Sequence, residues 1–413
     1  MNSKLKSKLK RLGVTKGART LVTPPKPAPP AAEQSASHLP LEKLLPGGRV
    51  ESNEQGNYFV VDAVYPLRYR HGGIHIESLL EHSPTCFDSY LNQTFPASFR
   101  DCLFIDTETT GLAGAGTIAF MVGVGFFERD ALVVRQYFVR DFGEEAAMLH
   151  DLDLLVAEYP TLISFNGKTF DIPLLKTRYL MNRLEDPFVE LPHIDLLHPA
   201  RRIWRRRLGS VALGALEESM LGVSRTHQDV PGALIPMMYH DYIRSGDPTQ
   251  MLRVFYHNKL DIVSMATLAA QLLRTITEPD LCEHVLDVYG LARWQLALEM
   301  PTAEAYLRQA AAMDCDTATW HEILLEIGRI LKRQDRRAEA VPLWLQIAHT
   351  TTSEVAAHVE LAKYYEWHEI DLAKALHWTT DALSILDTRD VVQFDELKHR
   401  YNRLTRKIQA TIT

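Results

Sequence analysis

The sequence predicts an α/β domain with a helical layer on its sheet, followed by an all-α region of helical repeats. Three consecutive β-rich runs after Asp101 give way to alternating helix and strand patterns, which indicates an α/β sheet. Beyond Glu278 the strand patterns stop, and Ala- and Leu-rich helical segments recur at a fixed spacing, which is typical of a repeat region. A chain of 413 residues is long enough for two or three domains.

The composition excludes several classes of protein. Hydrophobic residues make up 46% and charged residues 23% of the chain, which are ordinary globular values. The longest purely apolar run, residues 118–127, is about half a membrane span, and the basic start of the chain lacks the apolar core of a secretory signal. We therefore expect no transmembrane helix and a cytoplasmic protein. No CxxC spacing of a zinc ribbon, and no disulfide framework, is present among the four cysteines, Cys86, Cys102, Cys282 and Cys315.

Charge is distributed unevenly along the chain. The formal net charge is −7, yet residues 1–20 carry +7 without an acid, so the other residues carry −14. This basic arm is expected to contact nucleic acid, or a ribosomal or membrane surface, or to be a solvated tail. Residues 21–45 hold five prolines between Pro24 and Pro30 and are predicted to form a stiff linker. Residues 391–413 are predicted to be an exposed basic helix.

The predicted elements follow the periodicity of the apolar residues. Residues 46–100 contain short strands and a helix and are expected to extend the α/β domain, which we assign to residues 101–277. Within that domain strands are predicted at 102–106, 117–127, 131–139 and 161–165, and helices at 144–158, 171–183, 213–221 and 248–275.

The predicted repeat region, residues 285–390, has a period of 35. Ala305, Ala340 and Ala375 recur at this spacing, and small residues at one phase let paired helices approach closely. The period is similar to that of the tetratricopeptide repeat, and Gly328 fits that pattern. The proline that usually follows the second helix of a tetratricopeptide repeat is missing, and the first and third repeats lack the glycine. The region is therefore interpreted as a degenerate tetratricopeptide-like array, with an ordinary helical bundle as the alternative.

The clearest chemical pattern is a pair of acids at the end of the strand CLFI. Asp106 and Glu108 are two residues apart, so their side chains point to the same face of the strand. Two carboxylates side by side repel each other unless a cation lies between them, and oxygen ligands suit Mg²⁺ or Mn²⁺. A strand-end pair of this kind is weak evidence by itself.

Further polar residues fall at matching places in the predicted elements. Asn166 and Asp171 lie between the strand 161–165 and the helix that follows it. Asp261 lies on the long helix, and His257 is one turn before it, so the two share a helical face. These residues are therefore candidates for the same site.

The four acids in this order resemble the DEDD (DnaQ-like) 3′–5′ exonucleases, whose ribonuclease H-like fold is a mixed sheet flanked by helices. The succession of basic arm, exonuclease-like domain and tetratricopeptide-like region is similar to the YprB-type ribonuclease H-like proteins of bacteria. The resemblance implies two divalent cations, Mg²⁺ or Mn²⁺, held by these acids. It also implies that Asp106 bridges the cations, that Glu108 and Asp261 complete one site, and that Asp171 serves the second.

The general base departs from the pattern of the resembled exonucleases. One subgroup has a histidine five residues before the last acid, and the other has a tyrosine four before it. Here Tyr256 is five residues before Asp261 and His257 is four before it. Helical geometry and the pKa range of imidazole favour His257 as the base. Tyr256 is the alternative base, and a third possibility is that either residue only packs the helix.

Substrate contacts are predicted from the surroundings of the acids. Asn166 is expected to position the terminal nucleotide or to cap the next helix, and His193 and Asp195 to be strand-end structure or substrate support. The segment ARRIWRRR has the composition of a surface that tracks a backbone and stacks on bases, or of a solvated helix face. The predicted substrate-binding residues are Thr107, Thr109, Gly111, Leu112, Asn166, Arg202, Trp204 and Arg206.

These features predict a metal-dependent exonuclease that hydrolyses single-stranded DNA or RNA from the 3′ end. The helical repeats are expected to dock a protein partner. The first alternative is a scaffold that binds nucleic acid through a catalytically weak nuclease-like domain. A phosphodiesterase for a small nucleotide is a third hypothesis, and it would not need the basic arm.

Overall fold

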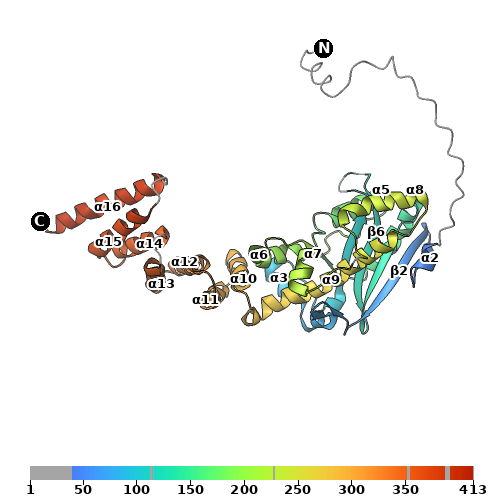
Figure 1. The fold of residues 1–413 in the computed structure, drawn as a ribbon, viewed down its shortest axis with the longest axis horizontal. Helices are drawn as coiled ribbons and strands as arrows, with labels where there is room; N and C mark the ends of the chain where they lie inside the picture. Colours follow the sequence, from blue (N-terminus) through green and yellow to red (C-terminus); the bar gives the residue numbers. More distant parts are fainter. Residues whose placement is uncertain are drawn as a thin grey trace, which may run out of the picture. The chain divides into compact units, whose positions relative to one another are not determined.

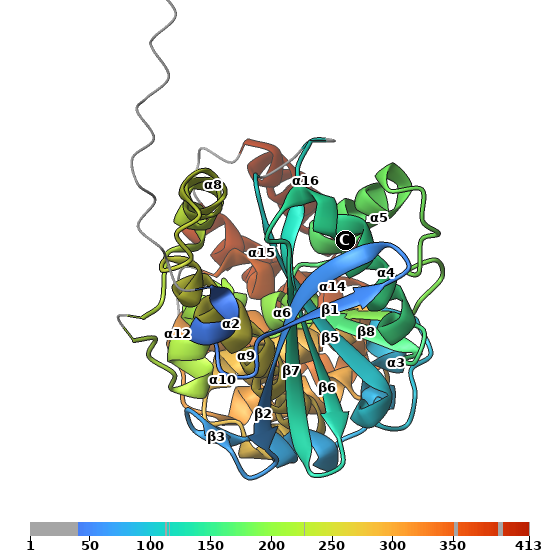
Figure 2. The ribbon, with the colours of Figure 1, turned by 90° about the vertical axis from the view of Figure 1, so that its right-hand side faces the viewer.

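The computed structural model describes residues 40–111, 114, 116–226, 228–350, 354–386 and 391–412. The predicted basic arm, most of the predicted linker and Leu112 therefore lie outside the described residues. A mixed seven-stranded sheet forms the centre of the first half, in the order β1-β2-β7-β6-β5-β8-β9 (Figures 1 and 2). Its strands are β1 Arg49–Asn53, β2 Gly56–Pro66, β5 Cys102–Thr109, β6 Ala119–Glu128, β7 Ala131–Phe138, β8 Thr161–Ser164 and β9 His193–Asp195.

The sheet has an antiparallel and a parallel part. Strands β1, β2, β7, β6 and β5 pair antiparallel, whereas β8 pairs parallel to β5 and β9 parallel to β8. Strand β2 pairs with β7 along its length, so residues before 101 supply two strands of this sheet. A separate small hairpin joins β3, Arg70–His71, to β4, Ile74–His75. The predicted α/β class and the expected strands are confirmed.

Helices cover both faces of the sheet. The α-helices of this half are α2 Leu41–Leu44, α3 Asp88–Leu91, α4 Glu145–Val156, α5 Asp171–Met181, α6 Leu197–Leu208, α7 Leu213–Leu216, α8 Ile235–Ser245 and α9 Met251–Thr277. Single turns of 3₁₀-helix occur at Ile76–Glu81, Pro84–Phe87, Phe99–Asp101, Phe142–Glu144, Gly232–Leu234 and Pro279–Leu281, and Glu217–Leu221 is a π-helix. In the described part of the chain no helix is long and apolar enough to cross a membrane.

Helix α9 lies unusually close to the sheet because β6 has glycines on the face that it covers. A Cβ atom on Gly123 would lie 2.2 Å from Asn258 Oδ1, and one on Gly125 would lie 2.5 Å from Ile262 Cγ2. Positions two apart on a strand share a face, so both glycines open the same side of β6 to α9. This close approach places the polar residues of α9 beside strand β5.

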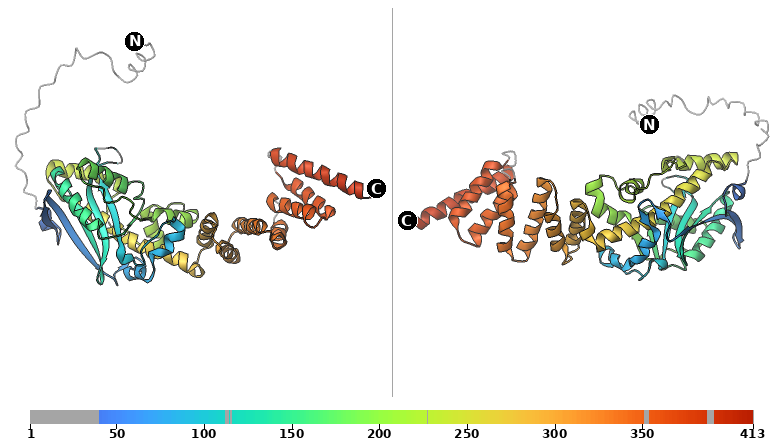
Figure 3. Two further views of the ribbon diagram at one scale, coloured as in Figure 1. Left: turned by 180° about the vertical axis from the view of Figure 1, so that it is seen from behind. Right: turned by 60° about the horizontal axis from the view of Figure 1, so that its bottom comes forward.

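The second half is built from successive helices that pack against their neighbours in the chain (Figure 3). Ala340 and Ala375 are fully buried at such contacts, and Gly328 lies against the Trp344 ring. Ala305 is exposed, so the expectation that it lets paired helices approach is wrong, and Ala303 and Leu307 are buried in its place. The helices are α10 Val285–Ala297, α11 Ala303–Ala312, α12 Thr317–Arg333, α13 Arg337–Thr350, α14 Val355–Trp367, α15 Leu372–Ile385 and α16 Val391–Ile412.

The contact between α9 and β6 predicts the effect of a single methyl group. We expect Gly123→Ala to lower the free energy of unfolding by about 1–3 kcal/mol, because the new Cβ overlaps the Asn258 side chain. Urea denaturation measures the change. Gly116→Ala is the control, since no atom lies within 4 Å of a Cβ placed there. Equal stability of Gly123→Ala and the wild type would contradict this account of the packing.

Candidate active site

The acidic end of β5 faces helix α9, as the alternation of the strand predicts. Asp106 Oδ2 accepts a hydrogen bond of 2.8 Å from Asn258 Nδ2 of α9. Glu108 Oε1 lies 4.0 Å from His257 Nε2 of the same helix. Thr107, between the two acids, points to the other face of the sheet. The two carboxylates therefore stand together against α9.

The third acid reaches β5 from its other side. Asp171 is the first residue of α5, and its Oδ1 accepts a hydrogen bond of 3.1 Å from the Thr107 N–H and a second from the Thr107 hydroxyl. Both donors belong to the residue between Asp106 and Glu108. Asp171 is thus fixed beside the acidic pair although 63 residues separate it from Glu108 in the chain.

The fourth acid comes from α9. Asp261 Oδ2 lies 3.5 Å from His257 Nε2, so the predicted pairing of these residues on one helical face is confirmed. One ligand atom from each of Glu108, His257 and Asp261 lies within 4.8 Å of the others, and such a group could hold a metal ion. The carboxylate oxygens of this group suit Mg²⁺ or Mn²⁺.

Burial and mutual repulsion raise the pKa values of these acids. Burial raises the pKa of Asp106 well above its usual range, and the charges of Asp261, Asp171 and Glu108 raise it further. The pKa of Glu108 is raised by the same causes. Burial also raises the pKa of Asp171 to about 6, although hydrogen bonds from Thr107 oppose this rise. A bound cation would relieve the repulsion, which is the physical argument that the cluster fits divalent metal.

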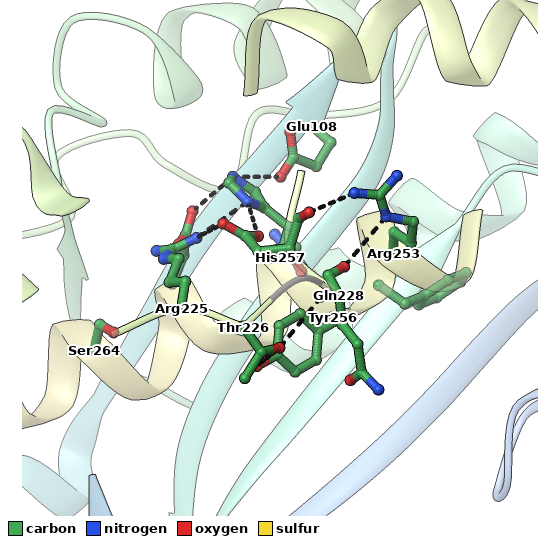
Figure 4. A network of polar contacts seen from close by, with 12 residues as sticks. Glu108, Arg225, Thr226, Gln228, Arg253, Tyr256, His257 and Ser264 are labelled. Atoms are coloured by element: carbon green, nitrogen blue, oxygen red, sulfur yellow. Dashed lines mark hydrogen bonds and ion pairs between the residues drawn. The ribbon is translucent and has the colours of Figure 1, made fainter. Parts of the chain in front are cut away.

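One fixed positive charge already borders the cluster (Figure 4). Arg225 donates two hydrogen bonds of 2.6 Å to the carboxylate of Glu217, which is 1% exposed, and a third to Asp261 Oδ1. Glu217 also accepts a hydrogen bond of 2.5 Å from Ser264. Burial lowers the pKa of Arg225, but its hydrogen bonds to Glu217 and the charge of Asp261 outweigh this and raise it. The guanidinium is therefore a permanent cation at Asp261.

The ring of His257 is oriented by Asp229. His257 Nδ1 lies 2.7 Å from Asp229 Oδ1 and 3.0 Å from Arg225 Nη1, and one nitrogen cannot both donate and accept. The shorter contact assigns the proton to Nδ1, donated to Asp229, so Nε2 faces Glu108 and Asp261 with a free lone pair. The Tyr256 hydroxyl instead lies 3.2 Å from that of Thr226, away from Glu108 (Figure 4).

The loop between β8 and α5 is held by a buried carboxylate. Asp195, at the end of β9, accepts hydrogen bonds from the N–H groups of Asn166 at 2.7 Å and Lys168 at 3.1 Å. The interpretation of Asp195 as strand-end structure is thereby supported. His193 is buried and bonds Ser164 at 2.7 Å, and burial lowers the pKa of His193 to about 3.

The prediction that Asn166 could cap the next helix is wrong. Helix α5 begins at Asp171, five residues later, and its first turn has no side-chain cap. Asn166 instead adopts a left-handed backbone conformation, with φ of 68°, and its N–H is the group that Asp195 binds. The positioning of a nucleotide by Asn166 remains a prediction.

A cavity of about 610 Å³ opens beside Asp171. Thr107, Thr109 and Gly111, three of the predicted substrate-binding residues, line it, and Phe170 is 53% exposed at its wall. Leu112 lies outside the described residues. The structure thus brings three predicted contacts and one acid to a single cavity, and Phe170 is an aromatic surface that the sequence analysis missed.

The predicted role of Trp204 in base stacking is wrong. Its side chain is fully buried, because it lies on the inward face of α6 among apolar neighbours. Arg202 is exposed, as expected. Arg206 is also exposed, but its guanidinium bonds Glu322 of α12 at 2.6 Å.

Four further polar residues that border the candidate site escaped the sequence analysis. Asn258 could have been found, because it precedes Asp261 by three residues and so shares its helical face. The other three lie between α7 and α8: one falls within the predicted helix 213–221, and two follow it in an irregular segment where no sequence signal marks them. They are Glu217, Arg225 and Asp229.

Three comparisons relate the chain to known proteins. The model of a family described as the RNase_H superfamily matches residues 103–273. The chain is similar to the uncharacterized protein YprB of Bacillus subtilis (strain 168), with 32% identity over 354 residues, 84% of this chain and 85% of that protein. Among solved structures, the family B DNA polymerase of the hyperthermophilic archaeon Pyrobaculum calidifontis matches with 18% identity and a TM-score of 0.34. That match covers 53% of this chain and 30% of the polymerase chain.

The raised pKa of Asp171 predicts how the stability of the metal-free protein depends on pH. A carboxyl group with a folded pKa of about 6 favours folding when protonated, and this contribution is lost as the pH rises through 6. In EDTA we therefore expect Asp171→Asn to be more stable than the wild type by about 1–3 kcal/mol above that pH. The difference should shrink below the ordinary aspartate pKa of about 4.

Thermal melts across this pH range measure the effect. Asp130→Asn, at an exposed turn, is the matched control and should melt like the wild type at every pH. An Asp171→Asn protein no more stable than the wild type in EDTA at neutral pH would show that the carboxylate is not destabilised by its burial.

Proposed function

Because the chain belongs to the YprB family of ribonuclease H-like proteins, we propose that it is a metal-dependent nuclease that degrades single-stranded DNA or RNA from the 3′ end. The observation that supports this most is the convergence of four carboxylates, two buried and two half-buried, with His257, between β5, α5 and α9. Such a concentration of carboxylates suits a site that binds divalent cations and uses them to hydrolyse a phosphodiester.

In the proposed site Asp106, Glu108, Asp171 and Asp261 hold two divalent cations, Mg²⁺ or Mn²⁺. Bound cations of this kind supply an activated water and neutralise the charge of the leaving oxygen. The pKa of Asp106 responds to the other three acids, which supports its place between the two metal positions. Glu108 and Asp261 lie on the His257 side, whereas Asp171 is held through Thr107 on the other.

His257 is the proposed general base. Its Nε2 lone pair faces Glu108 and Asp261 and can accept the proton of the attacking water. The hydrogen bond from Nδ1–H to Asp229 fixes the ring and stabilises the imidazolium that forms. The tyrosine alternative has less support, because the Tyr256 hydroxyl contacts Thr226.

The cavity beside Asp171 is proposed to hold the terminal nucleotide. Thr107, Thr109 and Gly111 offer polar side chains and backbone to the sugar and phosphate, and the Phe170 ring offers a face to the base. We further propose that Asn166 orients this nucleotide. The basic arm is proposed to bind the nucleic acid strand, and the tetratricopeptide-like helices are proposed to dock a protein partner. The protein is proposed to act in the cytoplasm.

A scaffold that binds nucleic acid with weak catalysis is the second candidate. It is favoured by Arg225, whose guanidinium is bonded to Asp261 and competes there with a cation. Under this alternative the acids would bind metal poorly, and strand binding would persist without turnover.

Loss of one central acid tests the proposal directly. We expect Asp106→Asn to reduce cleavage by about 10³-fold or more, because the metal positions lose the ligand between them. The measurement is a gel assay of 5′-labelled single-stranded DNA and RNA in Mn²⁺, in which the wild type should produce a ladder that shortens from the 3′ end. Asp101→Asn, exposed before the same strand, should cleave normally. No cleavage by the wild type, with retained binding, would favour the scaffold.

The identity of the base is tested by a second pair of variants. We expect His257→Gln to lower kcat by roughly 10²–10⁴-fold, whereas Tyr256→Phe should retain most activity. Single-turnover rates across pH measure both effects. Manganese affinity, followed by isothermal titration, distinguishes loss of a base from loss of a metal ligand. A severe defect in Tyr256→Phe with an active His257→Gln would reverse the assignment.

A further inference from the structure

A groove of about 580 Å³ lies between α6 and α10, outside the candidate active site. The two helices that form it pack against each other (Figure 1). None of the described residues that line it is acidic, although residues 21–413 as a whole carry a net charge of −14. Six basic side chains line it, which are His198, Arg201, Arg202, Arg205, Arg206 and Arg293.

The cations of α6 lie in one row because of their spacing. His198, Arg201, Arg202 and Arg205 occupy positions i, i+3, i+4 and i+7, which form one face of a helix. The opposite face, which includes Trp204, is buried in the core. Packing of the apolar face therefore turns the whole basic row outward.

Most of these cations have no counter-charge. In the described part of the chain no carboxylate lies within 4.0 Å of the guanidinium groups of Arg201, Arg202, Arg205 or Arg293. By contrast, Arg206 bonds Glu322 at the edge of the groove, His198 Nε2 lies 4.0 Å from Asp195 Oδ2, and Arg207, outside the groove, bonds Asp287. An unpaired row of guanidinium groups is a surface for an external anion, because like charges this close repel one another without one.

Helix α10 completes the groove by close contact with α6. A Cβ atom on Gly290 would lie 2.3 Å from the Ile203 carbonyl oxygen, so only glycine allows this approach. The approach brings Arg206 of α6 and Arg293 of α10 onto the same Tyr289 ring, at 5.1 Å and 5.8 Å from its centre. Two cations from separate helices are thus held around one point.

The groove is connected to the candidate active site through one carboxylate. Asp195 accepts hydrogen bonds from the N–H of Asn166, in the loop before Asp171, and from the N–H of Leu197, the first residue of α6. The basic row therefore starts at the residue that orders this loop. The loop before Asp171 and the start of α6 are thus tied to the same carboxylate.

We propose that the α6–α10 groove binds the phosphodiester backbone of the nucleic acid upstream of the end held in the active site. Arginine forks match phosphate oxygens, and a row of three arginines matches a regularly charged chain better than it matches single carboxylates. The inference rests on the proposed function for its substrate, but binding in the groove needs no catalysis. An acidic protein segment is the competing occupant.

Anisotropy of a fluorescein-labelled single-stranded DNA, measured in EDTA with the full chain, tests the proposal. We expect the double variant Arg201→Ala/Arg205→Ala to raise Kd by roughly tenfold and to lower the slope of log K against log salt by about 1.4. Arg201→Lys/Arg205→Lys should keep the slope. The charge-matched control Arg68→Ala/Arg333→Ala, at exposed positions outside the groove, should bind like the wild type.

The outcomes separate the groove from the nuclease. Weaker DNA binding by Arg201→Ala/Arg205→Ala supports the proposal that the groove binds the strand. This holds even if no variant cleaves DNA in Mn²⁺, in which case only the proposed nuclease activity fails. Unchanged Kd and slope would overturn the groove, whether or not the wild type cleaves. Displacement of the DNA by polyglutamate at equal charge concentration would also overturn it, in favour of an acidic protein partner. Unchanged circular dichroism confirms that the double variant is folded.

Discussion

The mutual repulsion of four carboxylates, buried or half-buried between β5, α5 and α9, is the constraint on which the rest of the structure depends. Burial alone raises the pKa of an acid, and three acidic neighbours raise that of Asp106 further. Such a cluster persists only if the surrounding fold holds it in place. Hydrogen bonds supply part of this: Thr107 holds Asp171, and Asn258 holds Asp106. The fold thus sustains an arrangement that is unfavourable without cations, which is the usual relation between stability and function at an active site.

The packing around the cluster follows from the same constraint. Gly123 and Gly125 allow α9 to approach the sheet closely enough for Asn258 to reach Asp106. Behind α9, the buried Glu217 fixes Arg225, whose positive charge offsets that of Asp261. The positive charge of Arg225 makes the metal-free site less negative. It also limits how strongly Asp261 attracts a cation. The guanidinium therefore tunes the site between stability and metal affinity.

Strand and helix periodicity predicted the parts of the site that lie on regular elements. The alternation of β5 placed Asp106 and Glu108 on one face, and one helical turn placed His257 beside Asp261. Arg225 could not be predicted, because it lies in an irregular segment where spacing carries no geometric information. Trp204 was misplaced for another reason: an aromatic residue among arginines has the same composition whether it is buried or exposed. Its spacing of seven from Leu197, which is also buried, does distinguish the two.

The two charged regions of the chain have complementary tasks. The acidic cluster repels a polyanion until cations are bound, so it cannot by itself attract a nucleic acid strand. The groove of unpaired arginines on α6 and α10 has the opposite sign and lies outside the cluster, connected to it through Asp195. Under the proposed function, attraction of the strand and chemistry on its end thus belong to separate surfaces. This separation lets the site retain a high density of carboxylates without excluding a negatively charged substrate.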